Sequence, residues 1–533
     1  MSECQSQMLK HPFWQEKNGN VLPLKNEDVV TYFAKFLPSL GFFKIPGKRG
    51  DGFIPVQIKG RFVRRVDEND IREFIVYLMN QDPLGNAVLD QMTLQHQKFF
   101  GSNIKTSLRV KSDLKTLKDT RITAYRFFRN CVVEVNGESV RAIDYDKLDS
   151  DIFIFIDKIL GRDFVLDQLI DEDSFLSDVT CHKGKHFYRW CQNLCRFRED
   201  NDWIFNQRSF KSLASGFGYL LHKSWNEQKI VVFTDKDMIS GVSNGRTGKS
   251  VVLNDALENA VNTVIVNAKS ISRFNSDRFL FSEVDHDTEY VCFDDGTADF
   301  PLESLFSTIT GNLAVERKHA NKFTIHKNDK PKMALSCNHP ILGEGFSFED
   351  RQHLVEVSDY YRYHKQEEYL DPVKIHGGYL FDEDWGTRNW QEFDTFCIYA
   401  LRYYLKHGLV GGKASSEYRT TKLHNEIGSA ELANALHRLI EENVNSIVYR
   451  EKIDGFADEV ALLDSVRSQL TTDYPDQHIV SSFKKVANHF GYRINEGQGK
   501  RIQKRFGSGL VDGYRITHSS NPFPKVMDDQ EGH

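Results

Sequence analysis

A glycine-rich loop between a short apolar run and a helix-forming stretch constrains this chain more than any other feature. The residues KIVVFT (229–234) precede the loop, GRTGKS (245–250) ends it, and VVLNDALENA (251–260) follows. A strand, a glycine-rich turn and a helix in this order place backbone N–H groups and a helix N-terminus around a phosphate. The segment therefore predicts a nucleotide site on an α/β unit.

The loop matches the phosphate-binding pattern G-x-x-x-x-G-K-[ST] except at its first position, where Ser243 replaces glycine. In this pattern the lysine reaches the terminal phosphates and the last hydroxyl binds Mg²⁺. The expected ATP-binding residues are Ser243, Asn244, Gly245, Arg246, Thr247, Gly248, Lys249 and Ser250. The alternative is a glycine-rich surface turn, which the flanking strand and helix disfavour.

A second strand supplies carboxylates for the metal. The run YVCFDDG (290–296) predicts a buried strand that ends in Asp294 and Asp295. One carboxylate at such a position binds Mg²⁺, together with Ser250, and the other orients the attacking water. The expected catalytic pair is therefore Asp294, on the metal, and Asp295. An exposed Asp-Asp-Gly turn is the alternative interpretation.

The next segment indicates what the nucleotide drives. Lys318 and His319 lie between two strand-like runs, so a hairpin would carry a cation and a flat ring to a DNA backbone. Asn338 ends the apolar run PKMALSC, where its amide is suited to holding the attacking water. Arg351 follows thirteen residues later and is suited to stabilising transition-state charge on a neighbouring subunit's ATP.

In order and spacing these elements resemble the superfamily 3 helicases, the AAA+ class of viral and mobile-element replication proteins. GRTGKS is similar to motif A, YVCFDDG to motif B, PKMALSCN to motif C, and ERKHANK to the pore hairpin of papillomavirus and polyomavirus helicases. The resemblance covers roughly residues 226–360 and departs at Ser243. It implies a homo-hexameric ring, single-stranded DNA contacted by Lys318 and His319 in the channel, and Arg351 as an arginine finger.

The expected fold is a multidomain α/β chain whose central AAA+ P-loop ATPase domain has a mainly parallel sheet. Residues 180–225 show helical spacing, and the run after 480 is typical of a helix followed by a short β unit. A weaker resemblance to phage and poxvirus primase-helicases concerns the region before the loop. The expected domains are a mixed α+β N-terminal domain (1–175), a helical collar (176–225), the AAA+ domain (226–410), a winged-helix-like domain (411–525) and a tail (526–533).

Composition sets the cellular context. Apolar residues make up 40% of the chain and charged residues 27%, with a net charge of −6, as in ordinary globular proteins. No apolar run is long enough to span a membrane, and the first twenty residues lack the apolar segment of a secretory signal. The eight scattered cysteines indicate reduced thiols. We expect a cytoplasmic protein, in a bacterial host, with no membrane partner.

The cysteines include one cluster that a zinc site would use. Cys181, His182, Cys191 and Cys195 lie close in sequence, but they lack the C-x2-C spacing of structural zinc sites. Buried thiols on helices are the favoured interpretation.

The favoured function is an ATP-dependent DNA helicase that replicates a phage, plasmid or mobile element. A nucleotide-gated switch or assembly ATPase in a defence or regulatory complex is the main alternative, and a small-molecule kinase is a further one. A combined primase-helicase would use Asp144, Asp146 and His182, which match a primase pattern only thinly.

Basic residues near the C-terminus predict a duplex DNA contact, with a solvated charged face as the alternative. They are Lys484, Lys485, Arg493, Lys500, Arg501, Lys504 and Arg505.

Overall fold

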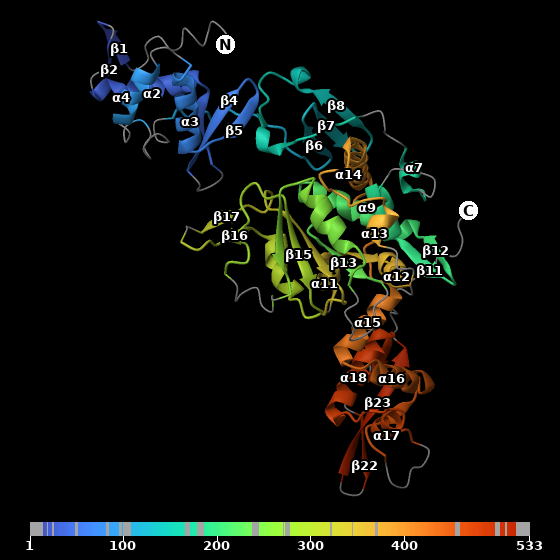
Figure 1. Cartoon of the computed structure of the whole chain (residues 1–533). Coiled ribbons are helices and arrows are strands. Elements are labelled where there is room, and N and C mark those ends of the chain that lie inside the picture. Colours follow the sequence, from blue (N-terminus) through green and yellow to red (C-terminus); the bar gives the residue numbers. More distant parts are fainter. Residues whose placement is uncertain are drawn as a thin grey trace.

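The structure is a computed structural model of the chain (Figure 1). It describes residues 14–18, 20–23, 26–47, 52–81, 85–94, 99, 108–165, 171–178, 186–236, 245–269, 271, 278–319, 322–343, 345–367, 371–452, 459–495, 502–506 and 509–518. The fold is multidomain α/β.

A five-stranded parallel sheet forms the centre of the molecule, as the alternation of strands and helices predicted. Its order is β14-β15-β18-β13-β19, and every neighbouring pair is parallel. Strands β13 and β18 are buried along their whole length, because a parallel sheet is covered on both faces. The strands are β13 (Ile230–Asp235), β14 (Thr263–Asn267), β15 (Tyr290–Gly296), β18 (Lys332–Cys337) and β19 (Gln352–Val357).

The two faces of this sheet bury separate cores, because successive strand residues point to opposite sides. Val231 belongs to a core with helices α9 (Gln207–Leu221) and α14 (Thr387–His407), whereas Ile230 belongs to a core with the segments that follow β15. Helices α9 and α14 approach so closely at Gly218 that a Cβ there would lie 2.0 Å from the carbonyl oxygen of Ala400. The remaining elements of the central unit are η4 (Val251–Ala256), η5 (Leu302–Leu305), α10 (Phe306–Thr310), β16 (Leu313–Val315), β17 (Phe323–Ile325), α11 (Phe346–Asp350), α12 (Tyr360–Glu367) and α13 (Pro372–Ile375).

The segment before the central unit is not helical throughout. Helices α7 (Glu172–Leu176) and α8 (His186–Asn193) precede a hairpin of β11 (Arg196–Glu199) and β12 (Asp202–Phe205). The helical prediction for 180–225 is therefore wrong at this hairpin. Asp200 adopts a left-handed φ of 54° at the turn, which Asp and Asn tolerate better than most residues.

Two four-stranded sheets lie in the N-terminal half, in addition to the antiparallel pair β1-β2. One has the order β3-β4-β5-β9 and packs on helices, and the other has the order β10-β6-β7-β8. Strands β6 and β7 share the core of α9 and α14, so this core extends across positions 175 and 225. The elements are β1 (Trp14–Lys17), β2 (Asn20–Pro23), α2 (Asn26–Ser39), β3 (Phe42–Pro46), β4 (Phe53–Lys59), β5 (Phe62–Arg65), α3 (Glu68–Met79), α4 (Gly85–Leu94), β6 (Thr123–Phe128), β7 (Cys131–Asn136), β8 (Val140–Asp144), η1 (Tyr145–Lys147), β9 (Ile154–Phe155), η2 (Ile156–Lys158) and β10 (Ile159–Leu160).

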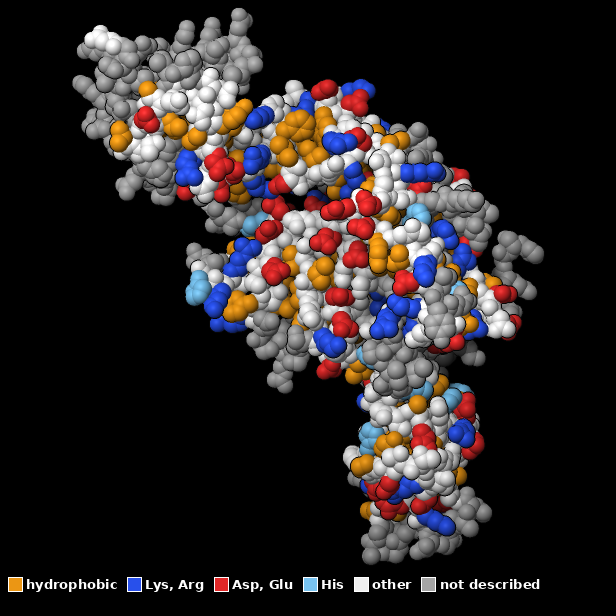
Figure 2. Space-filling view, in the orientation of Figure 1, with side chains coloured by type: hydrophobic (Ala, Val, Ile, Leu, Met, Phe, Trp, Pro, Cys, Tyr) orange, Lys and Arg blue, Asp and Glu red, His pale blue; other side chains and the backbone are white. Residues whose placement is uncertain are grey.

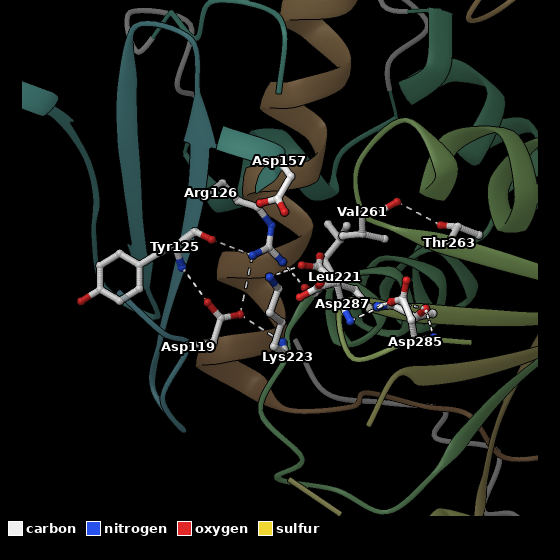
Figure 3. A network of polar contacts seen from close by, with 12 residues as sticks. Asp119, Tyr125, Arg126, Asp157, Leu221, Lys223, Val261, Thr263, Asp285 and Asp287 are labelled. Carbon is white, nitrogen blue, oxygen red and sulfur yellow. Dashed lines mark hydrogen bonds and ion pairs between the residues drawn. The ribbon is translucent and has the colours of Figure 1, made fainter. Parts of the chain in front are cut away.

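A polar network joins the β6 sheet to the central unit (Figure 3). Arg126 lies 3.6 Å from the carboxylate of Asp119 and donates to the carbonyl of Leu221 at the end of α9. The Lys223 amide also donates to Asp119, at 3.0 Å. Burial raises the pKa of Asp119, but Arg126, His222 and Lys223 together outweigh it and lower that pKa overall. The buried carboxylate is therefore ionised and well satisfied.

The C-terminal elements form a unit with a core of its own, drawn below the central unit in Figure 1. Its sheet has the order β20-β23-β21, and β22 pairs with β23 as an antiparallel hairpin. The elements are α15 (Ser416–Ile427), α16 (Ala430–Glu442), β20 (Ile447–Tyr449), α17 (Leu462–Arg467), α18 (Asp476–His489), β21 (Tyr492–Ile494), β22 (Ile502–Phe506) and β23 (Gly509–His518). Across the described part of the whole chain, no helix combines the length and apolar character that crossing a membrane requires.

Candidate nucleotide site and projecting hairpin

The phosphate loop follows β13 at the carboxyl edge of the parallel sheet. Residues 245–250 lead into the helix that contains η4, whereas the predicted contacts Ser243 and Asn244 lie outside the described residues. Gly245, Arg246 and Gly248 have φ angles of 28°, 61° and 96°. Left-handed backbone at these positions is typical of loops that turn their amides toward an anion.

Lys249 connects the ends of two neighbouring strands. Its ammonium group donates to Asp235 at 2.5 Å, at the end of β13, and to Asn338 at 2.8 Å, just after β18. It also lies 3.0 Å from the hydroxyl of Thr247, which donates to the same Asp235 oxygen. Lys249 is only 4% exposed, so these contacts replace water around its charge. The loop lysine is therefore held at the point where a phosphate would enter.

The predicted carboxylates lie at the same edge, at the end of β15. Asp294 accepts a hydrogen bond from Asn254 at 3.1 Å, and Asp295 accepts from Asn338 and from Lys269, each at 3.3 Å. The structure thus brings Asp294, Asp295 and Asn338 together with the loop lysine. The other oxygen of Asp294 and the exposed Ser250 provide hard oxygen donors, which Mg²⁺ prefers.

Two buried polar atoms at this edge support the fit to a bound group. Among the described residues, Asp235 Oδ2 and Asn254 Oδ1 are buried without a hydrogen-bond partner. Burial, with Glu258 and Asp294 nearby, raises the pKa of Asp255 on the adjacent helix. An edge with this surplus of oxygen atoms is suited to a divalent cation and its water ligands.

Three residues of this site were not foreseen from the sequence. Asp235 ends the run KIVVFTD, and its place at the carboxyl end of a buried strand is a signal that could have identified it. Asn254 is one turn into the helix and carries no such signal. Trp190 reaches the loop from α8: its indole N–H donates to the carbonyl of Gly248 at 3.2 Å. A Cβ at Gly248 would lie 2.8 Å from the Trp190 ring, so this contact needs glycine.

Trp190 is held in place by an aromatic stack with α12. Its ring stacks on Tyr361 of α12 with centroids 4.0 Å apart, and the Tyr361 hydroxyl lies 2.8 Å from His376 Nε2. Burial lowers the pKa of His376 to about 3, so this histidine is neutral. These contacts join α8 to α12 and to His376, the residue that follows α13, into one support for the loop.

Arg351 does not join the other predicted site residues. It follows α11 at the beginning of β19, next to Ile230 at the start of β13. The phosphate loop follows the opposite end of β13, so Arg351 and Lys249 lie at opposite edges of one sheet. Arg351 donates to the hydroxyl of Ser347 and lies over the Phe306 ring, 5.1 Å from its centroid.

Lys318 and His319 lie at the tip of an antiparallel hairpin formed by β16 and β17, which projects from the central unit in Figure 1. Both side chains are exposed, and Lys, Arg and His side chains gather on this projection in Figure 2. Below the tip, Glu316 pairs with Lys322 at 2.8 Å, and this hydrogen bond lowers the pKa of Glu316. Arg317 anchors the hairpin to the carbonyls of Ser282 and Val284.

Two thiols of the cysteine cluster are buried, which agrees with the interpretation favoured over a zinc site. Cys191 and Cys195 are 0% exposed, and burial raises the pKa of both thiols. Cys181 and His182 lie outside the described residues. Within the described ranges, no group of three or more His, Cys, Asp or Glu residues is arranged to hold a metal ion.

No protein-family model matches this sequence. No curated protein matches it. Among solved structures, the apo A form of the NrS-1 C-terminal region is similar over 74% of this chain and 96% of its own, with a TM-score of 0.33 and 11% identity. JCV helicase with a bound acetamide compound is similar over 48% of this chain and 69% of its own, with a TM-score of 0.26 and 14% identity. Both TM-scores are below 0.5, so neither similarity supports an argument about function.

Proposed function

We propose that the protein is an ATP-dependent DNA helicase of the superfamily 3 type, which works as a homo-hexameric ring on single-stranded DNA. One observation carries this proposal: Lys249, the carboxylates and Asn338 meet at one sheet edge, and the same unit projects Lys318 and His319 into solvent. A nucleotide site and an exposed cationic hairpin in one domain fit a motor that links hydrolysis to a charged strand.

The chain's own residues account for phosphate binding and water placement. The loop amides and Lys249 bind the phosphates, and Ser250 with Asp294 would hold Mg²⁺, which neutralises charge on the phosphates when it is bound. Asn338 donates to Asp295 and accepts from Lys249, so its amide is fixed in one orientation. In that orientation the Asp295–Asn338 pair is suited to positioning the attacking water against the terminal phosphate.

Arg351 acts in this proposal on the ATP of a neighbouring copy. Within its own chain it lies at the edge opposite the phosphate loop, so it contributes to a site only across a subunit boundary. An arginine supplied in trans stabilises transition-state charge in many nucleotide hydrolases. The same placement calls for a repeated head-to-tail contact, which closes into a ring or grows into a filament, and the ring is the arrangement proposed here.

The experiment that tests the proposal is the steady-state ATPase rate with and without single-stranded DNA. We expect strong stimulation in the wild type, no activity in Lys249→Ala, and unstimulated basal activity without unwinding in Lys318→Ala/His319→Ala. The double variant changes side chains at the hairpin tip only. Lys322→Ala removes a positive charge below the tip and therefore serves as the matched control. ATPase activity that ignores DNA in every variant would favour the nucleotide-gated switch or assembly ATPase instead.

The C-terminal unit is proposed as a second, duplex-binding element. From α16 onward, its order of helix, strand, two helices and three strands resembles that of a winged-helix domain, and α18 exposes Lys484 and Lys485. Lys504, by contrast, is already paired with Glu459. If the two α18 lysines bind phosphates, Lys484→Ala/Lys485→Ala should lower the salt dependence of duplex affinity by about two units of slope. An unchanged slope in salt titrations would leave α18 as a solvated face.

A further inference from the structure

A buried lysine closes the base of the projecting hairpin. Lys330 lies between β17 and β18, on the chain segment that returns from the hairpin, and is 4% exposed. Its ammonium group donates to the carbonyls of Thr308, Ile309 and Gly311, at 2.5, 2.5 and 2.9 Å. These carbonyls end α10 and precede β16, on the outgoing segment. Lys330 thus ties the two legs of the hairpin together.

Trp225 connects the same lysine to the segment that leads into β13, the strand before the phosphate loop. The indole N–H of Trp225, five residues before β13, donates to the Lys330 carbonyl at 2.9 Å, and the Lys330 ammonium lies 4.2 Å from the Trp225 ring centroid. Lys332, the first residue of β18, lies 4.5 Å from the same ring and donates to the Ser224 carbonyl. One tryptophan, five residues before β13, therefore contacts the start of β18 and the hairpin base.

Strands β13 and β18 run from this base to the nucleotide edge. They are adjacent and parallel, with Val231 opposite Ala334 and Phe233 opposite Ser336. At about 3.3 Å per residue, the strands separate the two edges by roughly 20 Å. At the far edge Lys249 contacts both strand ends, through Asp235 and Asn338. The pair of strands is thus connected across its ends at both edges.

We propose that Lys330 is a positioning residue that couples phosphate binding at Lys249 to the position of the β16–β17 hairpin. A bound phosphate competes with Asp235 and Asn338 for Lys249, which changes the connection between the two strand ends. Because β13 and β18 are paired, a displacement at their carboxyl ends is transmitted to their starts. There the contacts of Trp225 with Lys330 pass the displacement to the carbonyls that Lys330 holds. The coupling rests on the proposed function for nucleotide binding at Lys249, and it does not depend on what the hairpin contacts.

The Lys330 side chain is charged at neutral pH, as this role requires. Burial lowers the pKa of Lys330 to about 8, which still leaves the ammonium largely protonated at pH 7. Three carbonyl acceptors match the three donors of an ammonium group, so the side chain is saturated without a carboxylate.

Hydrogen exchange of the full chain, with and without Mg²⁺ and a non-hydrolysable ATP analogue, tests the coupling. We expect the analogue to change the exchange rates of hairpin amides, residues 311–325, by at least about threefold in the wild type. Lys330→Met should abolish this change while analogue affinity, measured by titration, stays within about twofold. Lys327→Met, an exposed lysine in the same turn, should behave as the wild type.

A second variant covers the case in which Lys330→Met does not fold. Trp225→Phe keeps an aromatic ring but removes the indole donor and part of the ring surface, so it should weaken the same change. The coupling is overturned if the wild-type hairpin does not respond to the analogue, or if both variants respond as fully as the wild type. Single-stranded DNA titration separates the two proposals: a response without DNA binding keeps the coupling and rejects the helicase.

Discussion

At the scale of single residues, Asp235 decides how the phosphate loop is organised. It is 1% exposed, and one oxygen accepts from both Lys249 and Thr247. A buried ion pair of this kind is costly to separate, since either partner alone would be an uncompensated charge. An incoming phosphate must therefore compete with a carboxylate that already holds the loop lysine.

Replacing Asp235 with Asn should strengthen nucleotide binding. The amide oxygen retains an acceptor for Lys249 and Thr247, whereas the competing negative charge is lost. We expect the affinity for Mg²⁺-ATP to rise about tenfold, which corresponds to about 1.4 kcal/mol. Titration with a fluorescent ATP analogue measures it, with Asp299→Asn, an exposed acid just after β15, as the control. Weaker binding would show that Asp235 prepares Lys249 for phosphate rather than competing with it.

At the scale of elements, His353 connects β19 to α9, on the face of the central sheet that packs on α9 and α14. It is 2% exposed, and its Nε2 lies 3.0 Å from the carbonyl of Ser212. Burial lowers the pKa of His353 to about 4, so the folded protein keeps the ring neutral. An unfolded histidine titrates near a pKa of about 6.5. Between these values the unfolded state binds a proton that the folded state does not.

This histidine should make the central unit sensitive to acid. The stabilisation is complete above about pH 6.5 and is lost as the pH falls toward 4, by about 2–3 kcal/mol at pH 4.5. His353→Gln should lower stability at pH 7.5 but remove this part of the pH dependence. Urea unfolding at pH 7.5 and 4.5 measures both effects, with the partly exposed His326→Gln as the control. Equal acid losses in His353→Gln and the wild type would contradict the assignment.

Helices and strands were predictable where the spacing of apolar residues within one short segment determines the element. The strands at β13, β14, β15, β18 and β19 follow apolar runs, and the polar residues at their ends share one edge because the sheet is parallel. The β11–β12 hairpin was missed because the helical spacing of the segments on either side, now α8 and α9, was extended across it. Phe197, Trp203 and Phe205 are in fact separated by even numbers of residues, as strand alternation requires.

Contacts between distant segments were not predictable. Trp190 reaches Gly248 across 58 residues, and Trp225 reaches Lys330 across 105. Nothing in either local sequence specifies such a partner, because each contact forms only when distant segments pack together. The first joins α8 to the phosphate loop, and the second joins the segment before β13 to the segment before β18. The lysines at 330 and 332 look like surface charges in the sequence and are buried in the fold.

At the scale of the whole molecule, the central sheet separates the two halves of the proposed catalytic machinery. Lys249 and the carboxylates lie at its carboxyl edge, and Arg351 lies at the other. Neighbouring copies arranged head to tail would bring one edge of each sheet to the opposite edge of the next. Each copy would then complete the site of its neighbour, and a single copy would hydrolyse ATP slowly.

Mixing two inactive variants tests this arrangement. Lys249→Ala removes the phosphate ligand and Arg351→Ala removes the arginine, so each should lower ATPase activity by about 100-fold or more. When equal amounts assemble together at random, about a quarter of the interfaces pair an intact loop with an intact Arg351 from the next copy. We therefore expect the mixture to recover up to about a quarter of wild-type activity. The control mixes Lys249→Ala with the double variant Lys249→Ala/Arg351→Ala, which offers no intact loop at any interface. Recovery limited to the sum of the separate variants, in mixtures shown by native mass spectrometry to contain both, would place Arg351 outside the active site.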